Sequence, residues 1–309
     1  MPPPLVPVIV GPTASGKTPV SILLAERLNG EIVSADSRQI YKRLTIGTAK
    51  PTIEELSRVK HHFVDLLEPD RDYSAGEYGK DARSVIGEVL ERGRIPILVG
   101  GSGLYIKAVV DGLFEGPGKD PEMREILESR MQREGAASLL AELRKVDPIA
   151  AAKMDSTKKR RILRALEVYY ITGKPLSEFH AEQSQDSRYR FVLFGLLWSR
   201  NALYDRINSR VEGMIERGLR EEVEGLRRDG FSSRLNALNT VGYKETFEFL
   251  DGMRGWVETV ELIKRNTRRF AKRQMTWFRA DKRIRWIDMT DTTLNEVAEF
   301  MEKEWRLSF

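Results

Sequence analysis

The chain has 309 residues, with 51 basic and 46 acidic side chains, three histidines and no cysteine. Without cysteine it can form no disulfide framework, thiolate metal site or catalytic thiol, which favours a reducing, cytoplasmic setting. The longest strongly apolar run, residues 191–198, is far shorter than the roughly 20 residues that span a bilayer, so we expect no membrane helix. The net charge of +5 is small, and its distribution along the chain is more informative than its sum.

Residues 5–10 are apolar, have no positively charged leader before them and run into a glycine-rich turn, so we predict a first strand. Two further β-branched segments, residues 31–35 and 95–99, alternate with amphipathic stretches, which is typical of β–α–β units on a parallel sheet. Each predicted strand ends in a polar or glycine-rich turn. Because ligands bind outside the carboxyl ends of parallel strands, we expect these three turns to face one crevice.

The segment GPGKDP, which begins at Gly116, marks a change to long stretches rich in Glu, Arg, Leu and Ala. We therefore predict a helical insertion domain over residues 117–188, between the two parts of a core formed by residues 1–116 and 189–309. Residues 189–198 have strand character again and are expected to rejoin the sheet. A helical pattern then continues to about Arg279, followed by a short strand at residues 284–288 and a terminal helix.

The segment GPTASGKT fits the phosphate-loop pattern G-x-x-x-x-G-K-[ST] and lies between a predicted strand and a predicted helix. Its glycines let backbone amides curl around phosphate oxygens, Lys17 supplies a mobile charge, and the Thr18 hydroxyl can bind Mg²⁺. The motif predicts polyphosphate binding but not which polyphosphate. It also makes the expected fold an α/β, P-loop NTPase-like parallel sheet flanked by helices. The predicted binding residues are Gly11, Pro12, Thr13, Ala14, Ser15, Gly16, Lys17 and Thr18.

Asp36 follows the second predicted strand and is expected to face the same crevice as Lys17. A carboxylate there can be a magnesium ligand, a general base or a helix N-cap. The donor-rich turn after it, residues 37–39, can bind a base edge or a phosphate, although such residues are also ordinary in loops. The third turn, GGSGLY at residues 100–105, permits either close approach of a ligand or a tight strand-to-helix connection.

Residues 260–279 segregate into two faces when each is advanced by about 100° along a helix. Solvated helix faces usually mix charges of both signs, but from Glu261 to Trp286 the only acids are Glu261 and Asp281, which favours nucleic acid binding. A second basic cluster lies at residues 158–161 with Arg164. The face expected to pack on the protein carries Val260, Ile263, Phe270, Gln274, Trp277 and Phe278, and the basic face carries Lys264, Arg265, Arg268, Arg269, Lys272, Arg273 and Arg279.

In order along the chain, GPTASGKT, DSRQIY, IGTAKP, GGSGLY and KRQMTWFR closely resemble the motifs of bacterial tRNA dimethylallyltransferases, and the match extends over nearly the whole chain. The resemblance implies that the loop holds the diphosphate of dimethylallyl diphosphate. It implies transfer of the dimethylallyl group to N6 of adenosine 37, next to the anticodon, with Mg²⁺ as cofactor and diphosphate as the second product. It also implies a cytoplasmic enzyme that binds the tRNA anticodon stem-loop, which we expect to be monomeric.

The resemblance further implies that residues 13–18 cradle the diphosphate, that Thr18 holds Mg²⁺ or a leaving-group oxygen, and that Asp36 takes the proton from adenine N6. Arg206 and Arg210 match the region of the catalytic arginine; Arg210 is our assignment, with the arginine that faces the diphosphate left open. Ser102 stands where threonine is usual. The tRNA contacts are expected at Asp36, Ser37, Arg38, Gln39, Ser102, Arg160, Arg161, Ile162, Leu163, Arg164, Asn239, Thr240, Val241, Gly242, Tyr243, Lys244, Lys272, Arg273, Gln274, Met275, Thr276, Trp277, Phe278 and Arg279.

The residues are suited to this chemistry, because positive charge around the diphosphate stabilises the leaving group of an allylic substrate. Asp36 as general base is expected to add about 10² to 10⁴-fold. The adenine must flip out of its stack, which needs a large RNA-binding surface. Three alternatives stay open: an adenine-nucleotide isopentenyltransferase, a P-loop kinase or NTPase for a small molecule, and an RNA-binding protein with a nucleotide switch. His61 and His62 are expected in the core or a surface turn, not at a metal.

Overall fold

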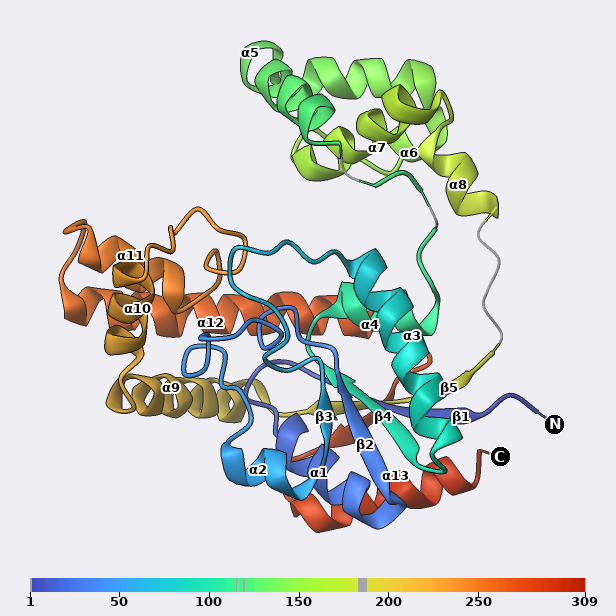
Figure 1. Cartoon of the computed structure of the whole chain (residues 1–309), viewed down its shortest axis with the longest axis vertical. Coiled ribbons are helices and arrows are strands. Elements are labelled where there is room, and N and C mark those ends of the chain that lie inside the picture. Colours follow the sequence, from blue (N-terminus) through green and yellow to red (C-terminus); the bar gives the residue numbers. More distant parts are fainter. Residues whose placement is uncertain (1, 115, 119, 183–187, 309) are drawn as a thin grey trace. The chain divides into compact units, whose positions relative to one another are not determined.

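The computed structural model describes residues 2–114, 116–118, 120–182 and 188–308 (Figure 1). The chain divides into two compact units, one formed by residues 1–110 and 187–309 and the other by residues 111–186. The sequence pattern predicts an insertion over residues 117–188, so the second unit begins earlier than predicted, directly after helix α4 (Gly103–Val110).

Within the described residues, the first unit contains a parallel sheet of six strands in the order β3-β2-β4-β1-β5-β6. A parallel sheet flanked by helices is the predicted fold class, and five of its strands lie within two residues of the predicted ranges. The sixth, β3, was missed because two residues are too short to show a period. The strands are β1 (Leu5–Val10), β2 (Gly30–Ser34), β3 (His61–His62), β4 (Ile95–Gly100), β5 (Arg190–Leu197) and β6 (Arg285–Asp288).

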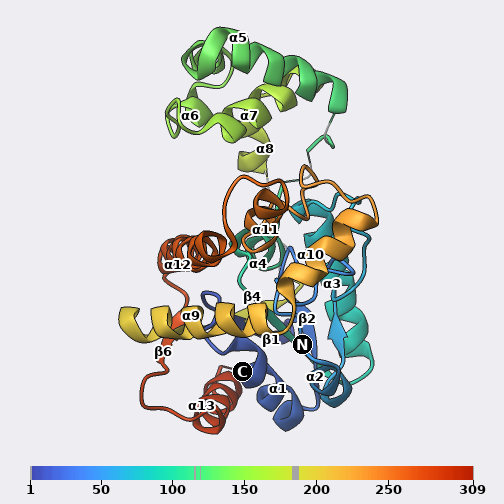
Figure 2. The ribbon, with the colours of Figure 1, turned by 90° about the vertical axis from the view of Figure 1, so that its left-hand side faces the viewer.

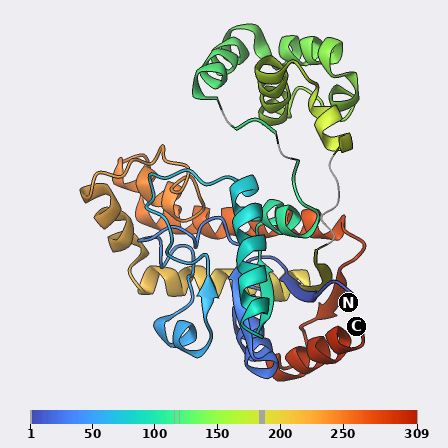
Figure 3. The ribbon, with the colours of Figure 1, turned by 45° about the vertical axis from the view of Figure 1, so that its right-hand side comes forward.

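The sheet is covered on both faces, so its central strands are apolar throughout. All six residues of β1 are buried. Val6, Val8 and Val10 face a core shared with α3 (Ala75–Glu91) and α4. Leu5 and Ile9 face a core shared with α1 (Lys17–Leu28) and α13 (Leu294–Arg306), two helices that lie side by side (Figure 3). The indole Nε1 of Trp305 donates to Leu5 O at 3.0 Å and ties the terminal helix to the first strand.

The first unit has five further helices among its described residues. Helices α9 and α12 pack against each other, and α12 also packs against α4 (Figures 1 and 2). They connect the sheet to a group of shorter helices and loops near the carboxyl ends of the strands. These helices are α2 (Ile53–Arg58), α9 (Arg200–Glu216), α10 (Leu219–Arg228), α11 (Tyr243–Leu250) and α12 (Trp256–Arg279).

Helix α12 begins four residues before the predicted start, and its packing face differs from the prediction in part. Ile263, Gln274 and Phe278 are buried as expected. Phe270 and Trp277 are not, since their side chains are 38% and 43% exposed, and Ala271 packs against the protein instead. Phe278 was also predicted to contact tRNA, but it is 2% exposed and belongs to the core.

The second unit has a core of its own, formed by four helices within its described residues. Ile162 and Leu163 belong to that core, so the prediction that their side chains contact tRNA is wrong. Arg164 makes its contacts within this unit, because its guanidinium donates to Pro117 O at 2.7 Å and pairs with Glu167 at 3.0 Å. Arg160 and Arg161 are exposed. The helices are α5 (Pro121–Val146), α6 (Pro148–Ala151), α7 (Lys159–Thr172) and α8 (Leu176–Glu182).

The His61 and His62 prediction needs correction. Both form edge strand β3, paired in parallel with β2. The ring Nε2 of His62 lies 2.7 Å from Glu31 Oε2, and the buried Glu31 carboxylate also accepts from Arg92 Nη2 at 2.8 Å. The contact of His62 with Glu31 thus joins the edge strand to its neighbour β2. No group of three or more His, Cys, Asp or Glu side chains suited to a metal occurs among the described residues. No helix in that part of the chain is long and apolar enough to cross a membrane.

Candidate functional site

A pocket of about 1680 Å³ lies at the carboxyl ends of β1, β2 and β4. Its lining includes residues 13–19 of the phosphate loop, residues 36–39 after β2 and residues 100–105 after β4. The predicted convergence of three turns on one crevice is therefore confirmed. Helices α9 and α12 contribute further walls, and so do residues 45–53, 239–242, 244 and 245. All of these segments belong to the first compact unit.

The phosphate loop is held by donors that bind its carbonyl groups. Gly16 has a φ of +95° and immediately precedes α1, whose N-terminus has no side-chain cap. The uncapped amides at this end, in the lining of the pocket, are suited to an anion. The bonds that hold the loop are Lys17 Nζ to Gly11 O (3.0 Å) and Pro12 O (2.7 Å), Arg206 Nε to Ala14 O (2.9 Å) and Trp198 Nε1 to Ser15 O (2.9 Å).

Gln274 on α12 connects the phosphate loop to the turn after β4. Its Oε1 accepts from the Thr13 amide at 2.9 Å, and its Nε2 donates to Gly101 O at 2.9 Å. The residue is 8% exposed, and each polar atom of its side chain makes one of these bonds. Gln274 also lines the pocket, so its contact with tRNA stays a prediction. The Thr13 amide is occupied by its bond to Gln274. Of the cradle predicted for residues 13–18, the backbone amides after Thr13 are therefore the ones left to bind a phosphate.

The glycines of the turn after β4 allow close packing of protein groups. A Cβ on Gly100 would lie 2.1 Å from Ala35 O, one on Gly101 would lie 2.4 Å from Gln274 Nε2, and one on Gly103 would lie 2.3 Å from Trp277 Cδ1. Of the two interpretations of this turn, the tight connection therefore accounts for these three positions. Ser102 stabilises the neighbouring turn, because its Oγ accepts from the Ser37 amide at 3.0 Å.

Asp36 lies in the same pocket and shapes the turn after β2. Its Oδ1 accepts from the amides of Arg38 (2.8 Å) and Gln39 (3.3 Å). Oδ1 therefore acts as a cap, as one of the three interpretations of Asp36 expects, but the segment that it caps is a turn and not a helix. Within the described chain Oδ2 has no hydrogen bond, so it is available to a substrate proton or a metal ion.

The cationic side chains that line the pocket include Lys17, Arg206, Arg210 and Arg217. Burial, and to a lesser degree the nearby Arg210, lowers the pKa of Lys17 to about 7, while Asp36 acts in the opposite direction. Burial also lowers the pKa values of Arg206 and Arg210, and Arg217 and Arg206 add to the effect on Arg210. Arg210 Nε is buried without a hydrogen-bond partner among the described residues. The site therefore holds positive charge that an anion would compensate.

Arg217 was not identified from the sequence as a residue of the pocket. It follows Arg210 by seven residues and Arg206 by eleven, a spacing that places all three on one helical face and could have identified it. Among the predicted tRNA contacts, Asn239, Thr240, Val241, Gly242 and Lys244 line the pocket. Tyr243 does not reach it, because its ring is fully buried and its hydroxyl donates to Glu222 Oε1 at 2.6 Å. Arg273 and Trp277 lie at the pocket, while Lys272, Thr276 and Arg279 are exposed and Met275 is half-buried.

A parallel sheet flanked by helices, with a glycine-rich loop, a cationic cluster and a carboxylate at one edge, gives the chain a P-loop NTPase-like fold. The IPP transferase family model matches residues 39–281, and the chain belongs to this family.

The relatives agree with this assignment. A tRNA dimethylallyltransferase of Pelotomaculum thermopropionicum is 50% identical, over 91% of this chain and 89% of its own length. Another, of Carboxydothermus hydrogenoformans, is 48% identical over 94% of both chains. A crystal structure of full-length tRNA isopentenylpyrophosphate transferase from Bacillus halodurans is 40% identical, covers 99% of both chains and has a TM-score of 0.72. A structure of a eukaryotic dimethylallyltransferase acting on tRNA is 29% identical and has a TM-score of 0.81, covering 93% of this chain and 74% of its own.

Gln274→Glu tests the bridge between the two turns. The carboxylate still accepts from the Thr13 amide but faces Gly101 O without a proton to donate, so we expect a loss of about 1–3 kcal/mol of unfolding free energy. We also expect weaker binding of inorganic pyrophosphate. Denaturant unfolding and calorimetric titration measure the two quantities. The matched control is Gln132→Glu at an exposed position of α5. Equal stability of both variants would contradict the proposed importance of the bridge.

The pKa of Lys17 predicts a proton linkage to anion binding. With a pKa of about 7, Lys17 is mostly neutral at pH 8 in the free protein, and a bound anion raises its pKa. Binding of pyrophosphate at pH 8 should therefore take up close to one more proton in the wild type than in Lys17→Met, and little more at pH 6. Calorimetry in buffers of different ionisation enthalpy measures the proton uptake of each protein. Protonation of pyrophosphate itself is common to both proteins and cancels in the difference. The same uptake in both proteins at pH 8 would be evidence against the linkage.

Proposed function

We propose that this protein transfers the dimethylallyl group of dimethylallyl diphosphate to N6 of adenosine 37 in tRNA, and that it does so in the cytoplasm as a monomer. The observation that carries the proposal is the presence, in one pocket, of a phosphate loop with a cationic cluster and of a carboxylate oxygen without a hydrogen bond among the described residues. The family assignment and the names of the relatives support it. The absence of cysteine is compatible with a reducing compartment.

In the proposed reaction a bond forms between adenine N6 and C1 of the dimethylallyl group, while the bond from C1 to the diphosphate oxygen breaks. The diphosphate leaves with the electron pair and the proton of N6 passes to Asp36 Oδ2. The uncapped end of α1 with Lys17, Arg206 and Arg210 stabilises the charge that develops on the leaving oxygen. Loop carbonyls already hold Lys17 and Arg206 in the free protein, which limits the reorganisation of these two groups during the reaction.

The donor set also fits a magnesium ion. Magnesium is usually bound by one or two carboxylates together with substrate phosphates and water. The Thr18 hydroxyl and the Asp36 carboxylate line the pocket, and a diphosphate would supply the remaining oxygens. When bound, the ion would neutralise charge on the diphosphate. Thr18 is the residue that we assign to it.

The tRNA is proposed to bind through the exposed cations of both units. In the first unit these include Lys272, Arg273 and Arg279 on α12, of which Arg273 lines the same pocket as Asn239, Thr240 and Lys244. In the second unit Arg160 and Arg161 are exposed at the start of α7, where no acidic residue lies in the first turn. The anticodon stem-loop is the part of the tRNA that carries the target adenosine.

The reaction is tested by incubating the protein with mixed tRNA and labelled dimethylallyl diphosphate and digesting the RNA to nucleosides. We expect label in N6-(dimethylallyl)adenosine. Label transferred to free adenine nucleotides would identify an adenine-nucleotide isopentenyltransferase. Magnesium-dependent ATP turnover without a need for tRNA would identify a kinase or NTPase. Either outcome in place of labelled tRNA would overturn the proposal.

Asp36→Asn tests the general base. Asparagine keeps an oxygen for the amides of Arg38 and Gln39 but cannot accept the proton of N6. We expect the single-turnover rate with bound substrates to fall by about 10² to 10⁴-fold, with little change in the affinity for tRNA or dimethylallyl diphosphate. The control is Asp70→Asn at an exposed position. A wild-type rate in Asp36→Asn would show that another group accepts the proton.

Replacement of Lys272 and Arg273 by Gln tests the RNA-binding surface of α12. We expect weaker tRNA binding and a shallower salt dependence, measured as log K against log salt concentration. The slope should fall by about 0.7–0.9 for each phosphate that the variant no longer neutralises. Lys264→Gln is the control on the same helix, because Lys264 already pairs with Glu212 (2.9 Å) and Glu261 (3.1 Å). If the double variant keeps the wild-type slope, these two cations do not bind phosphate.

A further inference from the structure

Glu222 on α10 accepts hydrogen bonds from four donors, three of them consecutive backbone amides of the pocket loop at residues 45–52. Its Oε2 accepts from the amides of Thr45 (3.0 Å) and Ile46 (2.8 Å), and its Oε1 accepts from the amide of Gly47 (3.2 Å). The Tyr243 hydroxyl donates to Oε1 at 2.6 Å. A carboxylate bound by several donors in this way fixes the backbone that it contacts.

The packing around this carboxylate leaves little freedom to the loop. A Cβ on Gly47 would lie 2.5 Å from Cε2 of the Tyr243 ring and 2.9 Å from Leu219 Cδ1. The Tyr243 ring is fully buried, and burial is the main cause that raises its pKa, so the hydroxyl keeps its proton and remains a donor to Glu222. Glu222 therefore holds residues 45–47 against α10 and α11.

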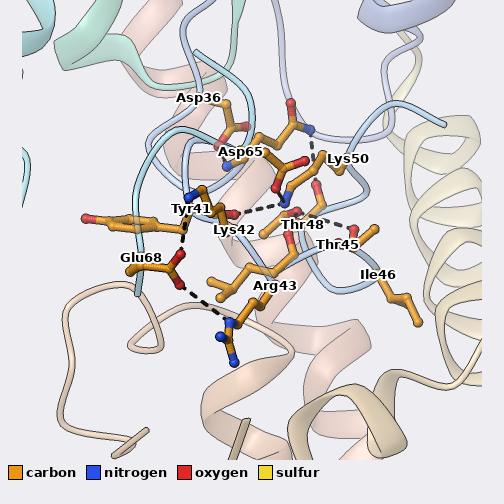
Figure 4. Close-up of polar contacts among 12 residues, drawn as sticks. Asp36, Tyr41, Lys42, Arg43, Thr45, Ile46, Thr48, Lys50, Asp65 and Glu68 are labelled. Carbon is orange, nitrogen blue, oxygen red and sulfur yellow. Dashed lines mark hydrogen bonds and ion pairs between the residues drawn. The ribbon is translucent and has the colours of Figure 1, made fainter. Parts of the chain in front are cut away.

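Further contacts link this loop to the turn at residues 36–39, which carries Asp36. Gln39 Nε2 donates to Thr48 O (3.2 Å) and Ala49 O (3.0 Å), so the loop positions the Gln39 side chain. The Gln39 amide in turn donates to Asp36 Oδ1 at 3.3 Å. Lys50 ties the other end of the loop to the same region, since its Nζ donates to Tyr41 O at 2.8 Å and pairs with Asp65 (Figure 4).

We propose that Glu222 is a positioning residue for the transfer reaction, which acts by fixing residues 45–49 and through them Gln39 and the carboxylate of Asp36. The inference rests on the proposed role of Asp36 as the proton acceptor. Glu222 does not line the pocket, and its hydrogen bonds go neither to the phosphate loop nor to the cationic cluster. We therefore expect its effect on the rate of transfer and not on diphosphate binding.

Glu222→Gln tests this inference. The amide nitrogen of glutamine is a donor, so it cannot accept a hydrogen bond from the backbone N–H groups that it would face. We expect the single-turnover rate with bound substrates to fall at least about tenfold, since small displacements of a catalytic group have effects of this size. The affinity for dimethylallyl diphosphate should stay within about twofold of the wild type, as expected when the phosphate loop is intact. The neighbouring Glu221→Gln, at an exposed position of the same helix, should keep the wild-type rate.

A double-mutant cycle separates positioning from general destabilisation. Gln39→Met removes the link between the loop and the turn, so Glu222→Gln should have little further effect in that background. Rates are measured well below the melting temperature of each variant. If Glu222→Gln does not fold, Tyr243→Phe takes its place, because it removes one donor from the same carboxylate and adds none.

Two results would overturn the inference: a wild-type rate in the Glu222 variant, or fully multiplicative effects in the cycle. A parallel measurement on Asp36→Asn distinguishes the positioning role from the assignment of the base. If Asp36→Asn loses activity and Glu222→Gln does not, the positioning role fails alone. If Asp36→Asn retains the wild-type rate, the assignment of the base fails as well.

Discussion

The pair of hydrogen bonds made by Gln274 determines the geometry on which the site depends. It joins a helix near the end of the chain to the loop after β1 and to the turn after β4, across 261 and 173 residues of sequence. The amide is suited to this position because it presents one acceptor and one donor, as the Thr13 amide and the Gly101 carbonyl require. Since it is nearly buried, either group left unpaired would retain the cost of its lost hydration. The same contact fixes α12 beside the pocket, and with it the exposed cations proposed to bind RNA.

The electrostatics of the pocket depend on this framework. Arg210 repels Lys17, Arg206 and Arg217, and its burial and that of Lys17 remove much of the water that would screen the charges. Carbonyl groups of the phosphate loop compensate in part by accepting from Lys17 and Arg206. The remaining imbalance favours a multiply charged anion. In the proposed reaction, the structure that holds these cations in place serves both diphosphate binding and stabilisation of the leaving group.

Much of the core could be predicted from the sequence, because local patterns carry the information. The phosphate loop is a contiguous motif, and buried parallel strands are short apolar runs between turns. The side chains of α12 could be assigned only in part. Periodicity correctly places Gln274 on the packing face, yet it cannot reveal that its partners lie in the first third of the chain. The same limit explains Arg164, whose charge suggested RNA contact but whose partners are Glu167 and Pro117. Long-range hydrogen bonds leave no period in the sequence.

Asp36 differs from the cations around it in how it is held. Its hydrogen bonds within the described chain come from neutral backbone amides, and no ion pair fixes it. A salt bridge to Lys17 or Arg210 would occupy the carboxylate and withdraw a cation from the diphosphate. Positioning through amides orients Oδ2 while leaving both charges available for their separate tasks. The turn must then be kept rigid by other contacts, and the bonds from Ser102, Gln39 and the loop at residues 45–52 supply them. The arrangement thus separates the groups proposed to bind the leaving group from the group proposed to accept the proton.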